Sequence, residues 1–267
     1  MSVTIALAGN PNCGKTTMFN ALTGANQYVG NWPGVTVEKK EGKLKNQKDV
    51  TVTDLPGIYS LSPYTLEEVV SRDYLLKEKP DVIIDLVDAT NIERNLYLAT
   101  QLLEIGIPVV IALNMVDLLK KNNIHINVKG LSSALGCPIV ETSALKGTGL
   151  KEVVDEAIKC ANQHRVPSKQ MEFPKAVEKA VNEIEGFVPA NIAEENKRWY
   201  AVKLLERDSK VKEGLNLPAS AQSRIEEIAS GLEKAEDDDT ESIVTDGRYQ
   251  YIQKVVSANV KRSGNKM

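Results

Sequence analysis

The stretch VTIALAGNPNCGKTT, residues 3–17, decides the fold of the first part of this chain. A nearly continuous apolar run, typical of a strand buried on both faces, leads directly into glycine, four residues and then Gly-Lys-Thr. A strand, such a turn and a helix form a phosphate-binding loop, the alternative being an ordinary strand–helix turn without a ligand. Gly9 and Gly14 let backbone N–H groups face a phosphate, Lys15 adds a cation, and Thr16 offers a hydroxyl to Mg²⁺. The residues predicted to contact a nucleotide here are Gly9, Asn10, Pro11, Asn12, Cys13, Gly14, Lys15, Thr16 and Thr17.

Apolar runs outside this stretch extend the same architecture. Four of them predict further strands of a mostly parallel sheet with helices on both faces, which is an α/β fold. Residues 35–44 alternate more and carry lysines, so they predict one antiparallel strand at the sheet edge. Helical stretches at 16–24 and 95–106 lie between the runs. The four runs are residues 50–55, 81–89, 107–114 and 137–143.

The character of the chain changes after Arg165, where no further strand-like run is found. Four stretches follow in which apolar residues recur at helical spacing. We therefore predict a nucleotide-binding domain over residues 1–164 and a smaller all-α domain over residues 165–267. The helical stretches are 173–187, 194–208, 218–236 and 240–262.

Composition excludes several classes of protein. Of the 267 residues, 42% are hydrophobic and 26% are charged, which is ordinary for a soluble globular protein. The net charge is −3, and the part after Arg165 has 16 basic against 18 acidic residues, so a nucleic-acid-binding arm is not expected. Three cysteines without paired spacing favour a reducing compartment over disulfides or zinc. No apolar run is long enough to span a bilayer.

The base of the nucleotide is predicted from the segment NMVD, residues 114–117, which follows an apolar strand. The Asp117 carboxylate can accept hydrogen bonds from the N1–H and exocyclic amine of guanine, a pattern that adenine does not offer. Asn114 can tie this segment to the phosphate loop, and the Ala144 N–H in TSAL, residues 142–145, can reach guanine O6. The predicted base-binding residues are Asn114, Met115, Asp117, Ser143 and Ala144.

The segment DLPG, residues 54–57, ends another strand. Asp54 can hold Mg²⁺ through a water, and the Gly57 N–H can reach a γ-phosphate. Thr36 lies in the segment between the phosphate-binding loop and DLPG, where it can supply a second hydroxyl to Mg²⁺. A solvated turn acid and an ordinary strand-edge residue are the alternatives for Asp54 and Thr36. The order of all four motifs makes a Mg²⁺-dependent GTPase the first hypothesis.

GNPNCGKTT, VGNWPGVTVE, DLPGIYSLSPYTLEE, ERNLYLATQL and ALNMVD together resemble the N-terminal domain of the bacterial ferrous iron transport protein B (FeoB) family, whose GTPase domain is of the Ras-like, translation-factor class. The helical part resembles, less specifically, the GDI-like helical domain of that family. The resemblance implies a GTPase at the cytoplasmic face of the bacterial inner membrane, joined to a membrane permease that is missing from this chain. Its implied partners are guanine nucleotide and that permease; a small cytosolic regulatory protein and a homo-oligomer are left open.

Hydrolysis needs a special device in this chain, because Ile58 follows DLPG where Ras has a water-orienting glutamine. The family resemblance implies that Asn12 ligates K⁺ beside the β- and γ-phosphates, aided by backbone carbonyls near Gly30 to Trp32; simple turn chemistry of Asn-Pro-Asn is the alternative. For Cys13, a small-residue position is favoured over a redox-sensitive thiol with a lowered pKa. The residues predicted to support catalysis are Asn12, Lys15, Thr36 and Gly57.

Two other functions compete with the transporter GTPase. One is a soluble translation-factor-class GTPase in ribosome assembly, which would carry a basic RNA-binding appendage. The other is a binding switch in which GTP occupancy signals to a partner and slow hydrolysis merely resets it. In each case residues 26–40 and 57–72 are expected to be switch loops that respond to the γ-phosphate.

Overall fold

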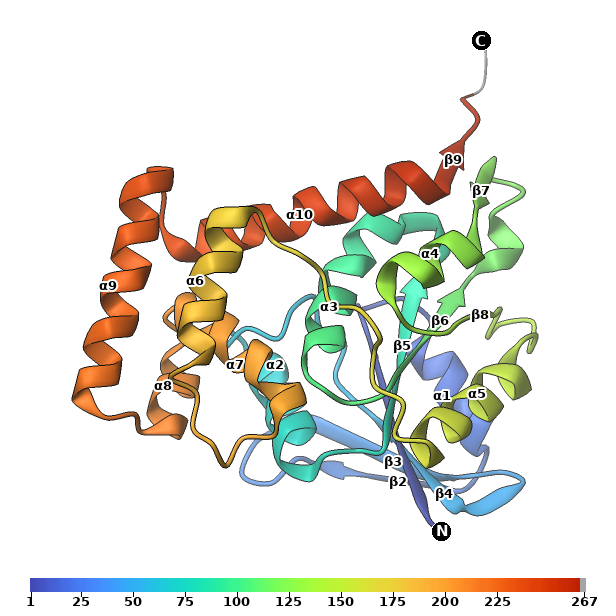
Figure 1. Cartoon of the computed structure of the whole chain (residues 1–267). Coiled ribbons are helices and arrows are strands. Elements are labelled where there is room, and N and C mark those ends of the chain that lie inside the picture. The colour runs from blue at the N-terminus through green and yellow to red at the C-terminus, as the bar shows by residue number, and fades with distance from the viewer. Residues whose placement is uncertain (265–267) are drawn as a thin grey trace. The chain divides into compact units, whose positions relative to one another are not determined.

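A seven-stranded sheet forms the centre of the first part of the protein (Figure 1). The structure is a computed structural model and describes residues 1–264. Strands β4, β1, β5, β6 and β8 run parallel, and β3 is antiparallel to both of its neighbours. In spatial order the strands are β2 (Gln27–Asn31), β3 (Glu38–Leu44), β4 (Gln47–Asp54), β1 (Val3–Gly9), β5 (Val82–Asp88), β6 (Val109–Asn114) and β8 (Ile139–Glu141).

The predicted fold class is confirmed, with one correction at the sheet edge. The antiparallel strand predicted over residues 35–44 is β3, but it is second from the edge. The edge strand is β2, which has only five residues and contains Gly30, so its alternation is too short to be recognised in the sequence. Strand pairing with β3 defines β2, since Val29 lies opposite Lys40.

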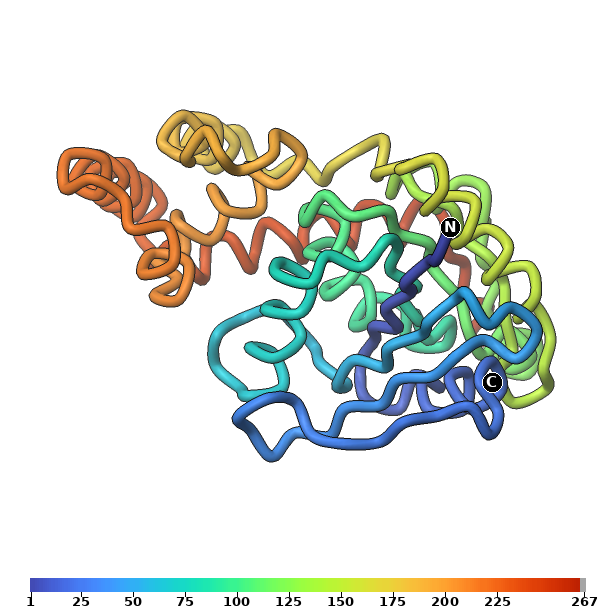
Figure 2. The backbone as a smooth tube through the Cα atoms, turned by 90° about the horizontal axis from the view of Figure 1, so that it is seen from below, coloured from blue at the N-terminus to red at the C-terminus, as the bar shows by residue number. Residues whose placement is uncertain are grey.

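Helices cover both faces of the sheet (Figures 1 and 2). One face carries α1 and α5, whose apolar side chains share a core with Ile5, Leu7 and Ile84. Gly24 has a left-handed φ of 58° and ends α1, as its sequence position predicts. The helices of this part are α1 (Lys15–Thr23), α2 (Leu66–Asp73), α3 (Ile92–Glu104), α4 (Val128–Leu135) and α5 (Leu150–Asn162), with short turns at Tyr74–Glu78, Ala89–Asn91 and Val116–Leu118.

The parallel strands place the predicted motifs at one edge of the sheet. Strand β1 ends at Gly9, β4 at Asp54 and β6 at Asn114. Because neighbouring parallel strands end on the same side, the loops that follow them meet there, which is where open α/β sheets bind ligands.

A second, two-stranded sheet pairs β7 (Ile124–Ile126) with β9 (Val260–Arg262) in antiparallel orientation. It could not be predicted, because strands of three residues show no periodicity. The Asn127 N–H donates to the Asn259 carbonyl at 2.7 Å beside this sheet. The end of the chain that was expected to be wholly helical therefore includes a short strand.

The chain divides into two compact units by its internal contacts. The larger unit holds both sheets, and the smaller one consists of Glu104–Gly106 and Met171–Lys254. The chain thus changes unit at Met171 and returns to the larger unit at Val255, whereas the sequence suggested a single boundary at residue 165. The helices beyond residue 170 are α6 (Lys175–Glu185), α7 (Glu194–Leu205), α8 (Ser209–Leu215), α9 (Ala219–Glu236) and α10 (Thr240–Asn259).

The smaller unit encloses a buried ion pair. Trp199 is fully buried, and the Arg248 guanidinium donates to both carboxylate oxygens of Glu104 at 2.9 and 2.8 Å. Both partners are at most 1% exposed, so each charge depends on the other for compensation.

No helix in residues 1–264 is both long and apolar enough to cross a membrane.

The core of the larger unit contains an isolated carboxyl group. Asp85, in the middle of β5, is 1% exposed, and its Oδ2 has no hydrogen-bond partner. Burial raises the pKa of Asp85 from 3.8 to about 8, so this side chain is mostly protonated at neutral pH. Because the pKa is higher in the folded state than in the unfolded one, stability is lost as the pH rises from 3.8 towards 8.

Replacing Asp85 with asparagine is expected to raise the free energy of unfolding by about 1–3 kcal/mol at pH 8. The gain should be smaller at pH 5, because that pH lies closer to the unfolded pKa of 3.8 and protonating the carboxyl group on folding costs less free energy there than at pH 8. Urea denaturation at both pH values measures it. Asp81→Asn is the control, because the Asp81 carboxylate already accepts a hydrogen bond from Thr4 N at 2.8 Å. An Asp85→Asn effect independent of pH would contradict this account.

Candidate functional site

The phosphate-binding loop connects β1 to α1 in the predicted order. Gly14 has a φ of 97°, and a Cβ there would lie 2.3 Å from Nδ2 of Asn114. Glycine is therefore required at position 14 both by the left-handed backbone and by the close approach of that amide. Helix α1 begins at the next residue, Lys15, so the positive end of its dipole borders the loop.

Lys15 lies beside Asp54, which joins two of the predicted motifs. Its Nζ donates to Asp54 Oδ1 at 2.8 Å and to the Leu55 carbonyl at 2.6 Å. Both charged side chains are about nine-tenths buried, at 10% and 8% exposure. The cation predicted for phosphate and the carboxylate predicted for a metal shell thus lie side by side.

The DLPG segment also lies against the phosphate loop. A Cβ at Gly57 would lie 3.1 Å from the Pro11 Cα, and the Ile58 N–H donates to the Gly9 carbonyl at 3.1 Å. The Ile58 side chain is only 3% exposed. Gly57 therefore presents backbone alone towards the loop, while the side chain that replaces a glutamine is in the core.

Asn114 links the third motif to the first, as predicted. Its Nδ2 donates to the Cys13 carbonyl at 2.9 Å, and its Oδ1 accepts from the Thr142 hydroxyl at 3.1 Å and the Ala144 N–H at 3.0 Å. One buried amide thus connects the phosphate loop, the end of β6 and the segment after β8. The Ala144 N–H that was predicted for guanine O6 donates to Asn114 in this structure.

Asp117 lies in the short turn after β6. Its side chain is 15% exposed, and the Lys146 ammonium is 3.6 Å from its Oδ2. Met115 has a left-handed φ of 65°, which turns the chain between Asn114 and Asp117. The Ser143 hydroxyl accepts from the Lys146 N–H at 3.4 Å. The predicted base-binding residues are therefore close to one another along two adjacent strand ends.

The first switch segment places its predicted residues differently. Gly30 lies in β2 opposite Lys39, and Trp32 is buried, with its ring 5.4 Å from that of Tyr74. Trp32 therefore packs against its own unit. Thr36 is exposed in the bend between β2 and β3. Asn12 is exposed as well and has a left-handed φ of 65°.

Cys13 is a structural residue. It is 1% exposed, and burial raises the pKa of its thiol to about 12, so the thiolate is rare at neutral pH. The hypothesis of a lowered pKa is wrong because the side chain faces the core rather than the helix end. A Cβ at Gly9 would lie 2.6 Å from the Cys13 sulfur, so the two positions pack tightly.

Several residues of the site were not singled out from the sequence, although they lie in or next to the quoted stretches. Thr142 and Lys146 contact the base-binding residues through their side chains, and Lys146 could have been noticed as the residue after TSAL. Arg94 contributes the carbonyl that accepts from Asn10 Nδ2 at 3.4 Å, and its guanidinium lies 4.5 Å from the Tyr59 ring. Gln101 holds the second switch segment. The sequence feature that could have drawn attention to Gln101 is a polar residue among the buried apolar residues of α3.

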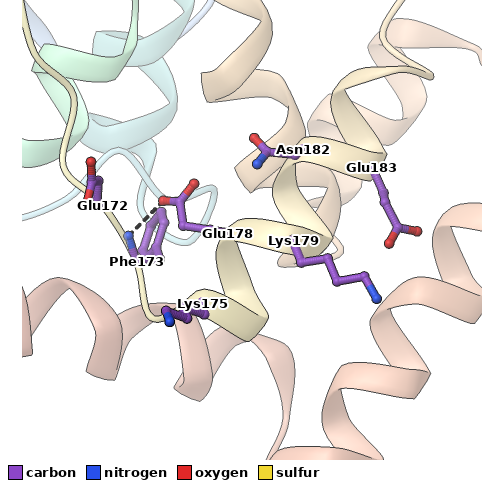
Figure 3. Close-up of a pocket in the computed structure, with 7 residues that line it drawn as sticks. All are labelled: Glu172, Phe173, Lys175, Glu178, Lys179, Asn182 and Glu183. Carbon is purple, nitrogen blue, oxygen red and sulfur yellow. Dashed lines mark hydrogen bonds between the residues drawn. The ribbon is translucent and has the colours of Figure 1, made fainter.

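The smaller unit has a hollow of its own, shown in Figure 3. Glu178 accepts from the Phe173 N–H at 2.7 Å, while the Lys179 and Glu183 side chains extend away from that bond (Figure 3). Two lysines and three glutamates line the hollow, so its lining has no net positive charge that would favour binding of a phosphate. Among the described residues, no three His, Cys, Asp or Glu side chains are grouped to hold a metal ion. The lining residues are Glu172, Phe173, Lys175, Glu178, Lys179, Asn182 and Glu183.

Fold, motif order and site together define a Ras-like P-loop domain followed by a helical domain. Comparison with known families gives the particular assignment. The family profile described as "Ferrous iron transport protein B" matches residues 3–157, and "FeoB cytosolic helical domain" matches residues 173–261. The chain belongs to the FeoB family.

Individual relatives agree with this assignment. The Fe(2+) transporter FeoB of Shigella flexneri is 41% identical over 260 residues, and that of Escherichia coli K12 is 40% identical over 260 residues. Each match covers 94% of this chain but 32% of the relative, so the chain spans about a third of their length.

Solved structures of FeoB from S. thermophilus are similar over nearly the whole chain. A GDP-bound mutant of the FeoB G-domain has a TM-score of 0.94 at 47% identity, covering 97% of this chain and 100% of that one. NFeoB bound to GDP·AlF4⁻ and K⁺ has a TM-score of 0.87 at 48% identity, covering 96% and 99%.

Proposed function

We propose that this chain binds GTP with Mg²⁺ and hydrolyses it to GDP and phosphate, as the cytosolic part of a bacterial ferrous iron transporter. The observation that carries the proposal is the Asn114 side chain, which joins Cys13 of the phosphate loop to Ala144 after β8. This frame lets Asp117 bind guanine while the phosphates lie along residues 9–17. The S. thermophilus structures that contain GDP support the choice of nucleotide.

The residues present fit a magnesium ion. Thr16 follows Lys15 in the first turn of α1, and the Asp54 carboxylate lies 2.8 Å from the Lys15 ammonium, so two of the oxygen donors lie near the cation proposed for phosphate. Thr16, Thr36 and Asp54 would hold the ion, which supplies charge neutralisation at the β- and γ-phosphates. Lys15 exchanges Asp54 for phosphate oxygens when nucleotide binds. The Gly57 N–H donates to the γ-phosphate while water attacks phosphorus and the bond to the β-phosphate oxygen breaks.

The nucleotide state would be passed on through the two switch segments. The relatives that match this chain are named Fe(2+) transporters and are about three times as long. We therefore place the chain at the cytoplasmic face of the cell membrane, with the membrane part of the full protein as its partner. Family membership favours this role over ribosome assembly, and residues 1–164 would carry the GTPase.

Potassium is proposed to stimulate hydrolysis. Ile58 is buried and apolar, so it cannot orient the attacking water, and another source of charge stabilisation is needed. The exposed Asn12 in the phosphate loop would ligate K⁺, together with carbonyls near Gly30 and Trp32. The S. thermophilus NFeoB structure with GDP·AlF4⁻ and K⁺ supports an ion in this family.

Moving the protein from a Na⁺ buffer to a K⁺ buffer is expected to raise GTP turnover about tenfold or more. The bound K⁺ adds one stabilising charge in the transition state. Asn12→Gly should remove the stimulation and leave GDP affinity within about twofold, because glycine accepts the φ of 65° without strain. Asn20→Ala is the control, since Asn20 Oδ1 accepts from Gln27 and lies in α1. Equal turnover in both salts would contradict the K⁺ site, while failure to bind GTP in preference to ATP by calorimetry would contradict the function itself.

A further inference from the structure

The inner face of α3 holds the second switch segment through one buried amide. Gln101 is 1% exposed. Its Oε1 accepts from the Leu61 N–H at 2.8 Å, and its Nε2 donates to the Ser60 hydroxyl at 3.0 Å. The Leu61 carbonyl accepts in turn from the Arg72 guanidinium at 3.4 Å. A single side chain therefore fixes two consecutive residues of the switch.

These bonds lie in an irregular part of the segment, where the Ile58 and Leu61 side chains are buried at 3% and 0% exposure. The described chain is irregular from Leu55 to Thr65, where α2 is about to begin. At its start the Ile58 N–H is bonded to the Gly9 carbonyl, and three residues later Gln101 binds Leu61. These two attachments, together with the buried side chains of Ile58 and Leu61, limit the path of the chain between them and so constrain Gly57.

Gly57 has little freedom to compensate for a shift. Its α-carbon packs against Pro11, since a Cβ added to Gly57 would lie 3.1 Å from the Pro11 Cα. A displacement of Ser60 and Leu61 is therefore transmitted to the backbone that borders the phosphate loop. Because Ile58 provides no water-orienting side chain, the placement of this backbone is a large part of what the switch can offer to catalysis.

We propose that Gln101 is a positioning residue for GTP hydrolysis: it holds residues 57–61 so that the Gly57 N–H is aimed at the γ-phosphate. The proposal rests on the GTPase function proposed above. Gln101 acts through Ser60 and Leu61 and need not touch nucleotide. It contributes to the transition state more than to ground-state binding of GDP, which has no γ-phosphate.

The test compares Gln101→Leu with wild type in K⁺ buffer, measuring kcat, KM for GTP, Kd for GDP and the melting temperature. The leucine variant is expected to lower kcat about tenfold or more while KM and the GDP Kd stay within about twofold. Asn95→Leu is the matched control on the same helix, because its buried amide bonds Asp88 N and the Asn91 carbonyl instead of the switch. It should lower the melting temperature comparably and leave kcat within about twofold.

Unchanged kcat in Gln101→Leu, or an equal loss of kcat in Asn95→Leu, would overturn the positioning role. If Gln101→Leu does not fold, Ser60→Ala replaces it, removing one of the two switch bonds with an expected fall in kcat of about threefold. Unchanged kcat in Ser60→Ala would then overturn the role. Absence of GTP turnover in the wild type would instead contradict the proposed function, so the two failures are distinguishable.

Discussion

Replacing Asp117 with asparagine is expected to weaken GTP and GDP binding by about 100-fold or more. The carboxylate is 15% exposed at the end of β6 and can accept two hydrogen bonds from guanine. Asparagine offers one acceptor and one donor, so its amide N–H would face the exocyclic amine of guanine and leave both donors unpaired. Calorimetry with GDP measures the loss.

The same variant should bind xanthosine diphosphate better than GDP. Xanthine has a carbonyl where guanine has its amine, and this oxygen accepts from the asparagine N–H. Asp73→Asn is the control, since Asp73 pairs with Lys77 on α2 and is 48% exposed. If Asp117→Asn kept its preference for guanine, this residue would not be the one that reads the base.

Replacing Lys15 with methionine is expected to reduce nucleotide affinity by about 100-fold or more and to abolish measurable turnover. Methionine keeps the apolar stem and removes the cation that would bind the outer phosphates. It also leaves the Asp54 carboxylate, only 8% exposed, without its partner at 2.8 Å. We therefore expect a lower melting temperature as well.

Two measurements separate the loss of charge from the loss of stability. Lys43→Met is a matched control, because Lys43 donates to the Thr51 hydroxyl on the exposed part of the sheet. The double variant Lys15→Met, Asp54→Asn should recover much of the melting temperature, since no unpaired buried charge remains. It should not recover nucleotide affinity. Near-normal GTP binding by Lys15→Met would contradict the phosphate-loop assignment.

The motifs of the site were recognisable because their geometry is local. The glycines around residues 9–14 and the helix that follows Lys15 depend on a few adjacent residues, and so does the turn at Asp117. Asn114 was predicted to reach the phosphate loop, and its amide does so across a sequence separation of 101 residues. That prediction succeeded because parallel strands bring their ends together in a known order.

Other contacts could not be predicted because they depend on packing. Ser60 and Gln101 are 41 residues apart, and nothing in either local pattern indicates that they meet. Asp85 looks like one polar residue in an apolar strand, yet it is buried with a carboxyl oxygen that has no hydrogen-bond partner. The thiol of Cys13 could have faced a helix end or the core, and only side-chain packing decides between them.

The sequence by itself determined the class of fold, the order of the nucleotide-binding motifs and the residue types offered to each part of a nucleotide. It could do so because strand periodicity, glycine turns and helix starts arise from interactions between near neighbours. The tertiary structure alone decided that β2 forms the edge, that Lys15 and Asp54 lie side by side, and that Gln101 fixes the switch. Those features depend on which distant side chains share one buried space, and that is settled only when the sheet and its helices pack together.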